Sequence, residues 1–151
     1  MRVNGKWMLC DDGAIRPVIS GSVRTASGPL IEVGFLLDAG ADRTVFSARF
    51  LNHLRDLETT DSPQILLSGV GGGADSITIK TEIAFAKDDG QTVTIRGTFG
   101  VFTKAESADL SVLGRDVTDN FSVIYDYPKQ IVALLAPPHL YEIESPALPL
   151  P

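Results

Sequence analysis

Residues 36–42 read Leu-Leu-Asp-Ala-Gly-Ala-Asp, which places a carboxylate directly after two leucines and before three small residues. Burying an ionised carboxylate costs free energy unless it is paired or protonated, so packing alone gives little reason for Asp38 at this place. One interpretation is a tight turn in which Asp38 accepts hydrogen bonds from backbone amides. The other is a functional carboxylate at the end of a buried strand. These residues alone leave both interpretations open.

The apolar stretches around this loop are short and are separated by turn residues, which is typical of an all-β domain. The stretch at 77–85 alternates apolar and other residues, as a half-buried strand does. Helical spacing predicts a short helix at about 47–57 with Ser47 as its N-cap, and one or two helical turns at 115–121. We expect strands at residues 7–10, 15–23, 30–37, 64–67, 77–85, 92–101, 123–127 and 131–135.

Length and composition predict one globular domain. The chain has 151 residues, a formal net charge of −6, 44% hydrophobic and 21% charged residues. We expect a single domain over residues 1–136 and a Pro-rich tail over 137–151. The acidic balance argues against nucleic-acid binding. No apolar run is long enough to span a membrane and the start lacks the pattern of a secretory signal, so we expect a cytoplasmic protein.

Other common chemistries find little support in the sequence. A single cysteine, Cys10, excludes an intramolecular disulfide and a cysteine-based zinc site. Asp38 and Asp42 alone give thin support for a metal site of carboxylates, so we expect no metal ion and no cofactor. His53 lies in the expected helix and His139 in the tail, so neither is placed as a general base.

Two further segments carry candidate functions. Residues 68–73 read Ser-Gly-Val-Gly-Gly-Gly, and a strand rather than a helix follows, which disfavours a phosphate-binding loop. They predict a hairpin tip that approaches a ligand closely, although an ordinary long turn is the alternative. Residues 112–116 read Val-Leu-Gly-Arg-Asp. There Gly114 suggests close backbone packing, and Arg115 is a partner for a nearby acid or part of a surface ion pair.

In this order, the three segments resemble those of the retropepsins, the retroviral-type aspartic proteases, and the resemblance spans about residues 16–135. Residues 36–45 are similar to the family's active-site loop. Residues 68–72 are similar to its flap tip, with Val70 at the apolar position. Residues 112–116 are similar to the turn and helix that support the loop.

This resemblance implies a closed acid-protease β-barrel with a flap hairpin and one or two short helices. It implies an aspartic endopeptidase in which two aspartates share one proton around a water molecule. Because the chain has one such loop, it implies a homodimer with a catalytic Asp38 from each copy. The residues that it implies for binding a peptide or protein substrate are Gly40, Ala41, Asp42, Gly69, Val70 and Gly71.

We also expect two arginines to act near the loop. Arg115 is expected to form a buried ion pair with Asp42 beneath the loop, because its planar fork suits a carboxylate. Arg16, near the start of the first long strand, is expected to reach the same acid from a second copy.

One residue departs from the family's pattern: Ala39 replaces the usual threonine or serine, whose hydroxyl links the two loops of the dimer. This favours an alternative function, a non-catalytic peptide-binding or assembly module with the same fold. A second alternative is an unrelated small β-barrel with a ligand in its mouth. The hairpin expected over residues 121–135 is longer than in the viral enzymes, so the dimer interface is expected to differ.

Overall fold

The computed structural model describes residues 1–60, 67–69, 72–105 and 110–137. The helical segments are the 3₁₀ turns η1 (Ala48–Phe50) and η2 (Arg55–Leu57) and the α-helices α1 (Leu51–Leu54) and α2 (Arg115–Thr118). The strands are β1 (Arg2–Asn4), β2 (Lys6–Leu9), β3 (Ile15–Arg24), β4 (Leu30–Leu37), β5 (Val45–Phe46), β6 (Leu67–Gly69), β7 (Gly72–Ala74), β8 (Ser76–Ala86), β9 (Thr92–Phe102), β10 (Ser111–Leu113), β11 (Ser122–Asp126) and β12 (Ile131–Leu135).

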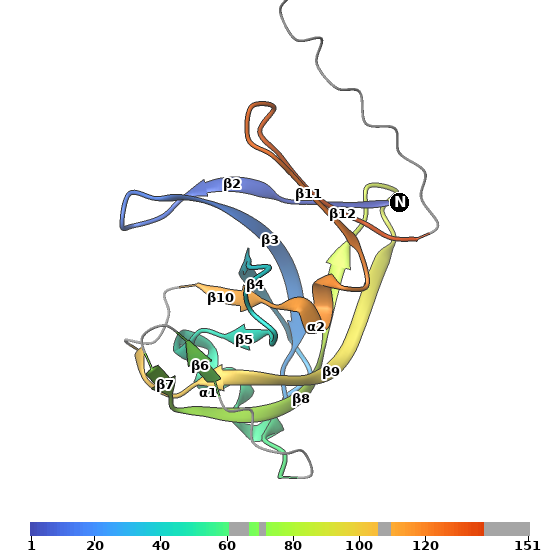
Figure 1. Ribbon diagram of the computed structural model, residues 1–151. Coiled ribbons are helices and arrows are strands. Elements are labelled where there is room, and N and C mark those ends of the chain that lie inside the picture. Colours follow the sequence, from blue (N-terminus) through green and yellow to red (C-terminus); the bar gives the residue numbers. More distant parts are fainter. Residues whose placement is uncertain (61–66, 70–71, 106–109, 138–151) are drawn as a thin grey trace, which may run out of the picture.

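The main feature is a closed barrel (Figure 1). Its sheet has the strand order β2-β3-β4-β10-β5-β9-β8, and β3 also pairs with β8 through Ser22↔Ala84 and Val23↔Ile83. That pairing closes a ring of β3, β4, β10, β5, β9 and β8, while β2 lies outside the ring on the first half of β3. The all-β barrel expected from the sequence is therefore confirmed.

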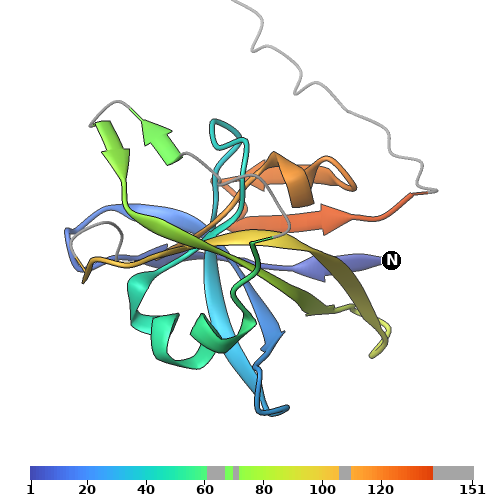
Figure 2. The same ribbon diagram turned by 90° about the horizontal axis from the view of Figure 1, so that it is seen from below.

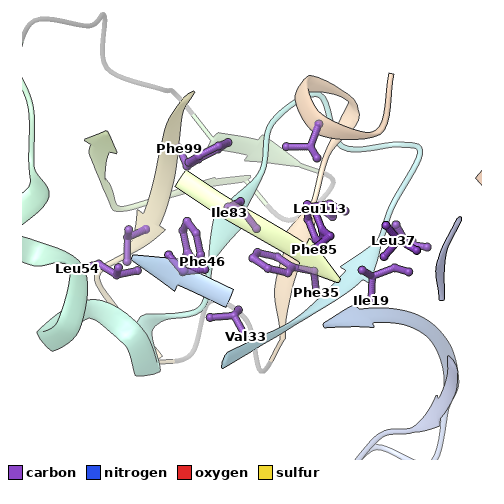
Figure 3. Packing of buried hydrophobic residues seen from close by; sticks show 14 of the residues in the cluster. Ile19, Val33, Phe35, Leu37, Phe46, Leu54, Ile83, Phe85, Phe99 and Leu113 are labelled. Carbon is purple, nitrogen blue, oxygen red and sulfur yellow. The ribbon is translucent and has the colours of Figure 1, made fainter. Parts of the chain in front are cut away.

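Buried aromatic side chains fill the barrel (Figure 3). Phe35 of β4 lies edge-on to Phe46 of β5, with ring centroids 5.5 Å apart, and 6.4 Å from Phe85 of β8. Phe46 in turn meets Phe99 of β9 at 6.1 Å. Rings from four strands thus form one continuous core, and edge-to-face geometry adds to the free energy gained by burial.

A second sheet of three strands, in the order β1-β12-β11, packs beside the barrel. Its inner side chains, Val3 of β1 and Val132 and Leu134 of β12, are buried in the common core. The sheet therefore joins both ends of the described chain to the barrel.

Most expected elements appear where the periodicity placed them. The strand at 30–37 matches β4. The strands expected at 7–10 and 15–23 form the hairpin β2–β3, and those expected at 123–127 and 131–135 form the hairpin β11–β12. No helix among the described residues is long and apolar enough to cross a membrane.

The expected helix and the list of expected strands need correction, and some other expectations concern residues that the structure does not describe. The helix at 47–57 is a succession of η1, α1 and η2 rather than one α-helix, although the Ser47 side chain does accept a hydrogen bond from the Arg49 N–H (3.4 Å). Strand β1 was not expected, because three residues with one apolar side chain show no periodicity. Of the strand expected at 64–67, only Leu67 is described, and residues 138–151 of the expected tail lie outside the described residues.

Candidate active site

Asp38 follows β4 and lies in the loop that leads to β5. Parallel pairing of β10 with β4 through Leu113↔Leu37 brings the end of β10 beside the start of this loop. There the Asp38 N–H donates to the Leu113 carbonyl (3.3 Å). In Figure 2 the loop and the β6–β7 hairpin project from the same side of the barrel. The sheet therefore fixes the point from which the Asp38 side chain leaves the barrel.

The Asp38 side chain is half-buried, while Ala39 and Gly40 are exposed. Its Oδ1 accepts a hydrogen bond from the Gly40 N–H (2.9 Å), and its carbonyl accepts one from the Ala41 N–H (3.1 Å). The turn interpretation is thus correct in its geometry. It does not exclude the functional interpretation, because the same bonds hold the carboxylate in one orientation at the surface.

A partly buried hydrogen-bond network holds the far end of the loop. The Asp116 carboxylate accepts bonds from the Thr44 N–H (2.9 and 3.0 Å) and the Thr44 hydroxyl (2.7 Å). That hydroxyl accepts a bond from the Gly114 N–H (3.0 Å), and the Thr44 side chain is fully buried. Every polar group in this cluster has a partner, which makes such a network stabilising rather than costly.

Backbone contacts extend the same link. The Arg115 N–H donates to the Ala41 carbonyl (2.8 Å) and the Asp116 N–H to the Asp42 carbonyl (3.2 Å). A Cβ atom on Gly114 would lie 2.4–2.8 Å from backbone atoms of Arg43, so only glycine permits this approach. The close packing expected at Gly114 is therefore confirmed.

The sequence did not reveal Thr44 and Asp116 as the pair that joins the two segments. An aspartate in the first turn of a helix is common, so Asp116 by itself indicates no special role. Thr44 is a neutral residue between a charged loop and an apolar strand, and it does not indicate one either. Their relation is visible only once β10 pairs with β4, because they lie 72 positions apart.

The expected Arg115–Asp42 ion pair forms, but it is not buried. Their side chains are 54% and 76% exposed. The hydrogen bond to Asp42 raises the pKa of Arg115 above its ordinary value. Solvent screens such a pair, so it contributes little to the stability of the loop.

Arg16 has a partner in its own hairpin. Its guanidinium makes two parallel hydrogen bonds to the Asp12 carboxylate (2.6 and 2.7 Å). These bonds hold the pKa of Asp12 well below its usual range. The contact between Arg16 and Asp42 of a second copy stays a prediction.

A cavity of about 430 Å³ lies beside the loop, between the β2–β3 hairpin and the β4–β10 pair. Leu36 and Val112, which are register partners, line its apolar side, and the Asp12–Arg16 pair lines its polar side. Leu36 stands two residues before Asp38, so one wall of the cavity belongs to the strand that leads into the loop. No sequence pattern indicated this cavity, because its lining comes from four separate segments.

The expected substrate-binding residues are only partly described. Gly40 and Asp42 are exposed and Ala41 is half-buried in the loop. Gly69 ends β6 and pairs with Gly72 of β7, so the glycine-rich segment does form a hairpin. Val70 and Gly71, at its tip, lie outside the described residues.

The charge of Asp38 acts on Tyr125 of β11. Burial, and then the negative charge of Asp38, raise the pKa of Tyr125 above its ordinary value. Strand β11 is therefore part of the surroundings of the candidate site, a role that the sequence did not indicate.

Comparison with known proteins identifies the fold. No protein-family model matches the sequence, and no curated protein matches it significantly. Among solved structures, a retropepsin-like aspartic protease from Rickettsia conorii is similar over 89% of this chain and 89% of its own, with 15% identity and a TM-score of 0.52. EIAV protease complexed with the inhibitor HBY-793 is 24% identical, covers 69% of this chain and 86% of its own, and has a TM-score of 0.44. The chain has a retropepsin-like fold, as its three sequence segments predict.

Proposed function

We propose that this protein is an aspartic endopeptidase of the retropepsin type and that Asp38 is its catalytic residue. The observation that carries the proposal is the position of Asp38. Its half-buried carboxylate stands on a loop fixed at both ends by hydrogen bonds, beside a cavity, in a retropepsin-like fold. A carboxylate held in one place and one orientation is what activation of a water molecule requires.

The proposed active form contains two chains. Two carboxylates about 3 Å apart cannot both ionise, so one serves as general base and the other as general acid. The base removes a proton from water, which attacks the peptide carbonyl, while the acid protonates the carbonyl oxygen. The C–N bond of this tetrahedral intermediate then breaks: the carboxyl that took the water proton gives it to the leaving amine, and the other carboxylate takes back a hydroxyl proton as the new carboxylic acid forms. Since one chain supplies one Asp-x-Gly loop, a twofold axis between two copies would place both Asp38 side chains together.

The exposed side of the loop is suited to an extended peptide. The backbone of Gly40 is accessible there, and the cavity lined by Leu36 and Val112 is available for a substrate side chain. Backbone hydrogen bonds would supply affinity for a peptide, and the cavity would supply the preference for particular side chains.

Ala39 supports a second candidate function, a peptide-binding module without catalytic activity. The side chain at this position is exposed on the loop and carries no hydroxyl. Without a hydroxyl to link two loops, the two Asp38 groups are held less firmly, and binding can persist where catalysis is weak.

The test compares cleavage and binding on the same protein. Full-length protein is incubated with an unfolded protein substrate from pH 3 to pH 7, with and without pepstatin. The variant Asp38→Asn keeps an oxygen that accepts from the Gly40 N–H, so it is expected to fold and to lose cleavage. Asp56→Asn, at an exposed position of η2, is the matched control and is expected to cleave normally.

The outcomes separate the two functions. Cleavage that Asp38→Asn abolishes and pepstatin inhibits supports the endopeptidase. Cleavage that survives Asp38→Asn contradicts it. Peptide binding without cleavage at any pH supports the non-catalytic module.

A further inference from the structure

The turn between β2 and β3 contributes charged side chains to the lining of the 430 Å³ cavity. Asp11, Asp12 and Arg16 of this hairpin line the cavity, together with Arg49 of η1. Figure 1 shows the turn projecting beyond the barrel. Ligand sites are commonly cavities of this size, mostly apolar with a few polar groups that decide specificity. The charged residues of the lining therefore influence which side chain the cavity accepts.

Local turn chemistry accounts for two of the turn residues, Asp12 and Gly13. The Gly13 N–H donates to the Cys10 carbonyl (2.9 Å), and the Cys10 N–H donates to the Ala14 carbonyl (2.8 Å). Gly13 has a φ of 81°, a conformation that favours glycine. Asp12 Oδ1 accepts a bond from the Ala14 N–H (3.0 Å), as aspartate does in many turns. These bonds hold the tip of the hairpin in one conformation.

Asp12 and Arg16 form a closed ion pair. Both terminal nitrogens of the Arg16 guanidinium donate to Asp12, Nη1 to Oδ1 (2.7 Å) and Nη2 to Oδ2 (2.6 Å). In such a bidentate pair the two charges offset each other at close range. The pair therefore adds little net charge to the cavity, and it ties the turn to β3.

Asp11 is different, because its charge has no partner. Its exposed side chain makes no hydrogen bond or ion pair within the part of the chain that the structure describes. Arg49, by contrast, has interactions of its own. The bonds that shape the turn do not use the Asp11 side chain, so turn chemistry gives no reason for a carboxylate at this position. Asp11 leaves an uncompensated negative charge in the lining.

A lysine or arginine side chain complements this lining. Its methylene stem can lie along the apolar wall of Leu36 and Val112 while its charged end reaches Asp11, since long basic side chains commonly bury the stem and keep the head in polar surroundings. The formal net charge of −6 also favours the approach of a cation over that of an anion. An acidic side chain would meet Asp11 with a like charge.

We propose that Asp11 is a specificity-determining residue, which selects peptides that carry lysine or arginine at the position whose side chain enters this cavity. The inference rests on the proposed function and names the substrate class of that site. Because the carboxylate is exposed and solvent screens its charge, we expect a preference of about fivefold rather than a strict requirement.

The first experiment maps cleavage sites. Full-length protein digests a mixture of unfolded proteins, and the products are aligned by mass spectrometry. We expect lysine and arginine to be enriched at one position near the cleaved bond. Asp11→Asn keeps the shape of the side chain and removes its charge, so it should reduce this enrichment about fivefold. Asp56→Asn, at an exposed position of η2 outside the lining, is the control and should keep the wild-type pattern.

A second variant tests whether charge rather than shape is responsible. Asp12→Asn leaves Asp11 in place but replaces the carboxylate that pairs with Arg16 by a neutral amide. The positive charge of Arg16 is then no longer offset. We expect the enrichment of basic residues to fall and acidic residues to be accepted at the same position. An unchanged pattern would contradict selection by charge.

A binding measurement separates recognition from cleavage. Full-length Asp38→Asn is titrated into two labelled decapeptide pools that differ in one residue, a lysine or a norleucine, and fluorescence anisotropy reports binding. Norleucine has an apolar stem similar to that of lysine but no ammonium group. The lysine pool should bind about fivefold more tightly at low salt and less so at high salt. Adding Asp11→Asn to this variant should make the two pools bind equally.

The results distinguish this inference from the proposed function. Cleavage without a preference for basic residues, or with one that Asp11→Asn leaves intact, overturns the role of Asp11 and leaves the endopeptidase standing. Tighter binding of the lysine pool that depends on Asp11, in a protein that cleaves nothing, supports the role of Asp11 and contradicts the endopeptidase. A protein that neither cleaves nor binds either pool contradicts both.

Discussion

The inner and outer sides of the Asp38 loop are built differently. On the inner side, Thr44 is fully buried and joined to Asp116 and Gly114 by hydrogen bonds. On the outer side, Ala39 and Gly40 are exposed, and the one ion pair, Asp42–Arg115, is open to solvent. One chain is thus sufficient to fix the inner side. The outer side is available for a second copy or a substrate, and substitutions on the two sides are expected to have different consequences.

The largest effect is expected from Gly114→Ala on the inner side. The added methyl group would lie 2.4–2.8 Å from backbone atoms of Arg43, so the loop or the 114–116 turn must move. We expect the free energy of unfolding to fall by about 3 kcal/mol or more, the upper range for overpacking. Gly34→Ala in β4 is the control, because its methyl group would meet only Val18 Cγ1 at 3.6 Å. Urea denaturation measures both, and equal losses would mean that the close approach at Gly114 is not a constraint.

Asp116→Ala is expected to have the next largest effect. It removes the acceptor of the Thr44 N–H and hydroxyl and leaves both groups buried. A buried donor without a partner costs about 1–3 kcal/mol, so we expect a loss of about 2 kcal/mol in the free energy of unfolding. Asp116→Asn keeps one carbonyl oxygen and should lose less. Asp119→Ala, at an exposed position one turn further, is the control and should change stability little. A loss for Asp116→Ala no greater than for Asp119→Ala would contradict the network.

These two sites also show how far the sequence can be read. The alternation of apolar and other residues predicted β8, and the turn residues on either side predicted β4. Both patterns are local, and local periodicity indicates which side chains face the core. The order of the three segments at 36–42, 68–73 and 112–116 predicted the loop, the hairpin and the turn that supports the loop. The bond between Thr44 and Asp116 was not predictable, since it depends on parallel pairing of two strands far apart in the chain. The exposure of Asp42–Arg115 was not predictable either, because burial depends on which elements cover the pair.

On the outer side, Ala39→Thr is expected to strengthen the proposed dimer. A hydroxyl that bonds across the axis contributes about 1 kcal/mol net and forms twice, so the dimer should gain about 2 kcal/mol. Ala39→Val is the control, because valine has the shape of threonine without the hydroxyl. Dimer dissociation and peptide cleavage are measured for both. If valine strengthens the dimer as much as threonine, or threonine weakens it, the loops are held together by something other than this bond.

Arg115→Ala is expected to change stability far less than Asp116→Ala, although both residues hold the same loop. Its ion pair with Asp42 is exposed and screened by salt, while its backbone N–H still donates to the Ala41 carbonyl after the substitution. The measurement is the urea midpoint at low and at high salt. The difference between wild type and variant should be small at low salt and smaller at high salt. A loss comparable to that of Asp116→Ala would show that the pair becomes buried, as it would if a second copy covers it.

The smallest expected effect is a shift in the titration of Tyr125, and it tests whether the outer side is occupied. Burial and the charge of Asp38 both raise the pKa of this phenol, because each disfavours the phenolate. Asp38→Asn removes the charge but not the burial, so the pKa should fall while staying above that of an exposed tyrosine. Tyr125→Phe identifies the signal, because it leaves the other two tyrosines of the chain, Tyr127 and Tyr141, in place. The titration is followed by ultraviolet absorbance at protein concentrations below and above the dimer dissociation constant. If a second copy covers Tyr125, its burial increases and its pKa rises further with protein concentration, whereas a concentration-independent pKa in a protein that dimerises would show that Tyr125 stays outside the interface.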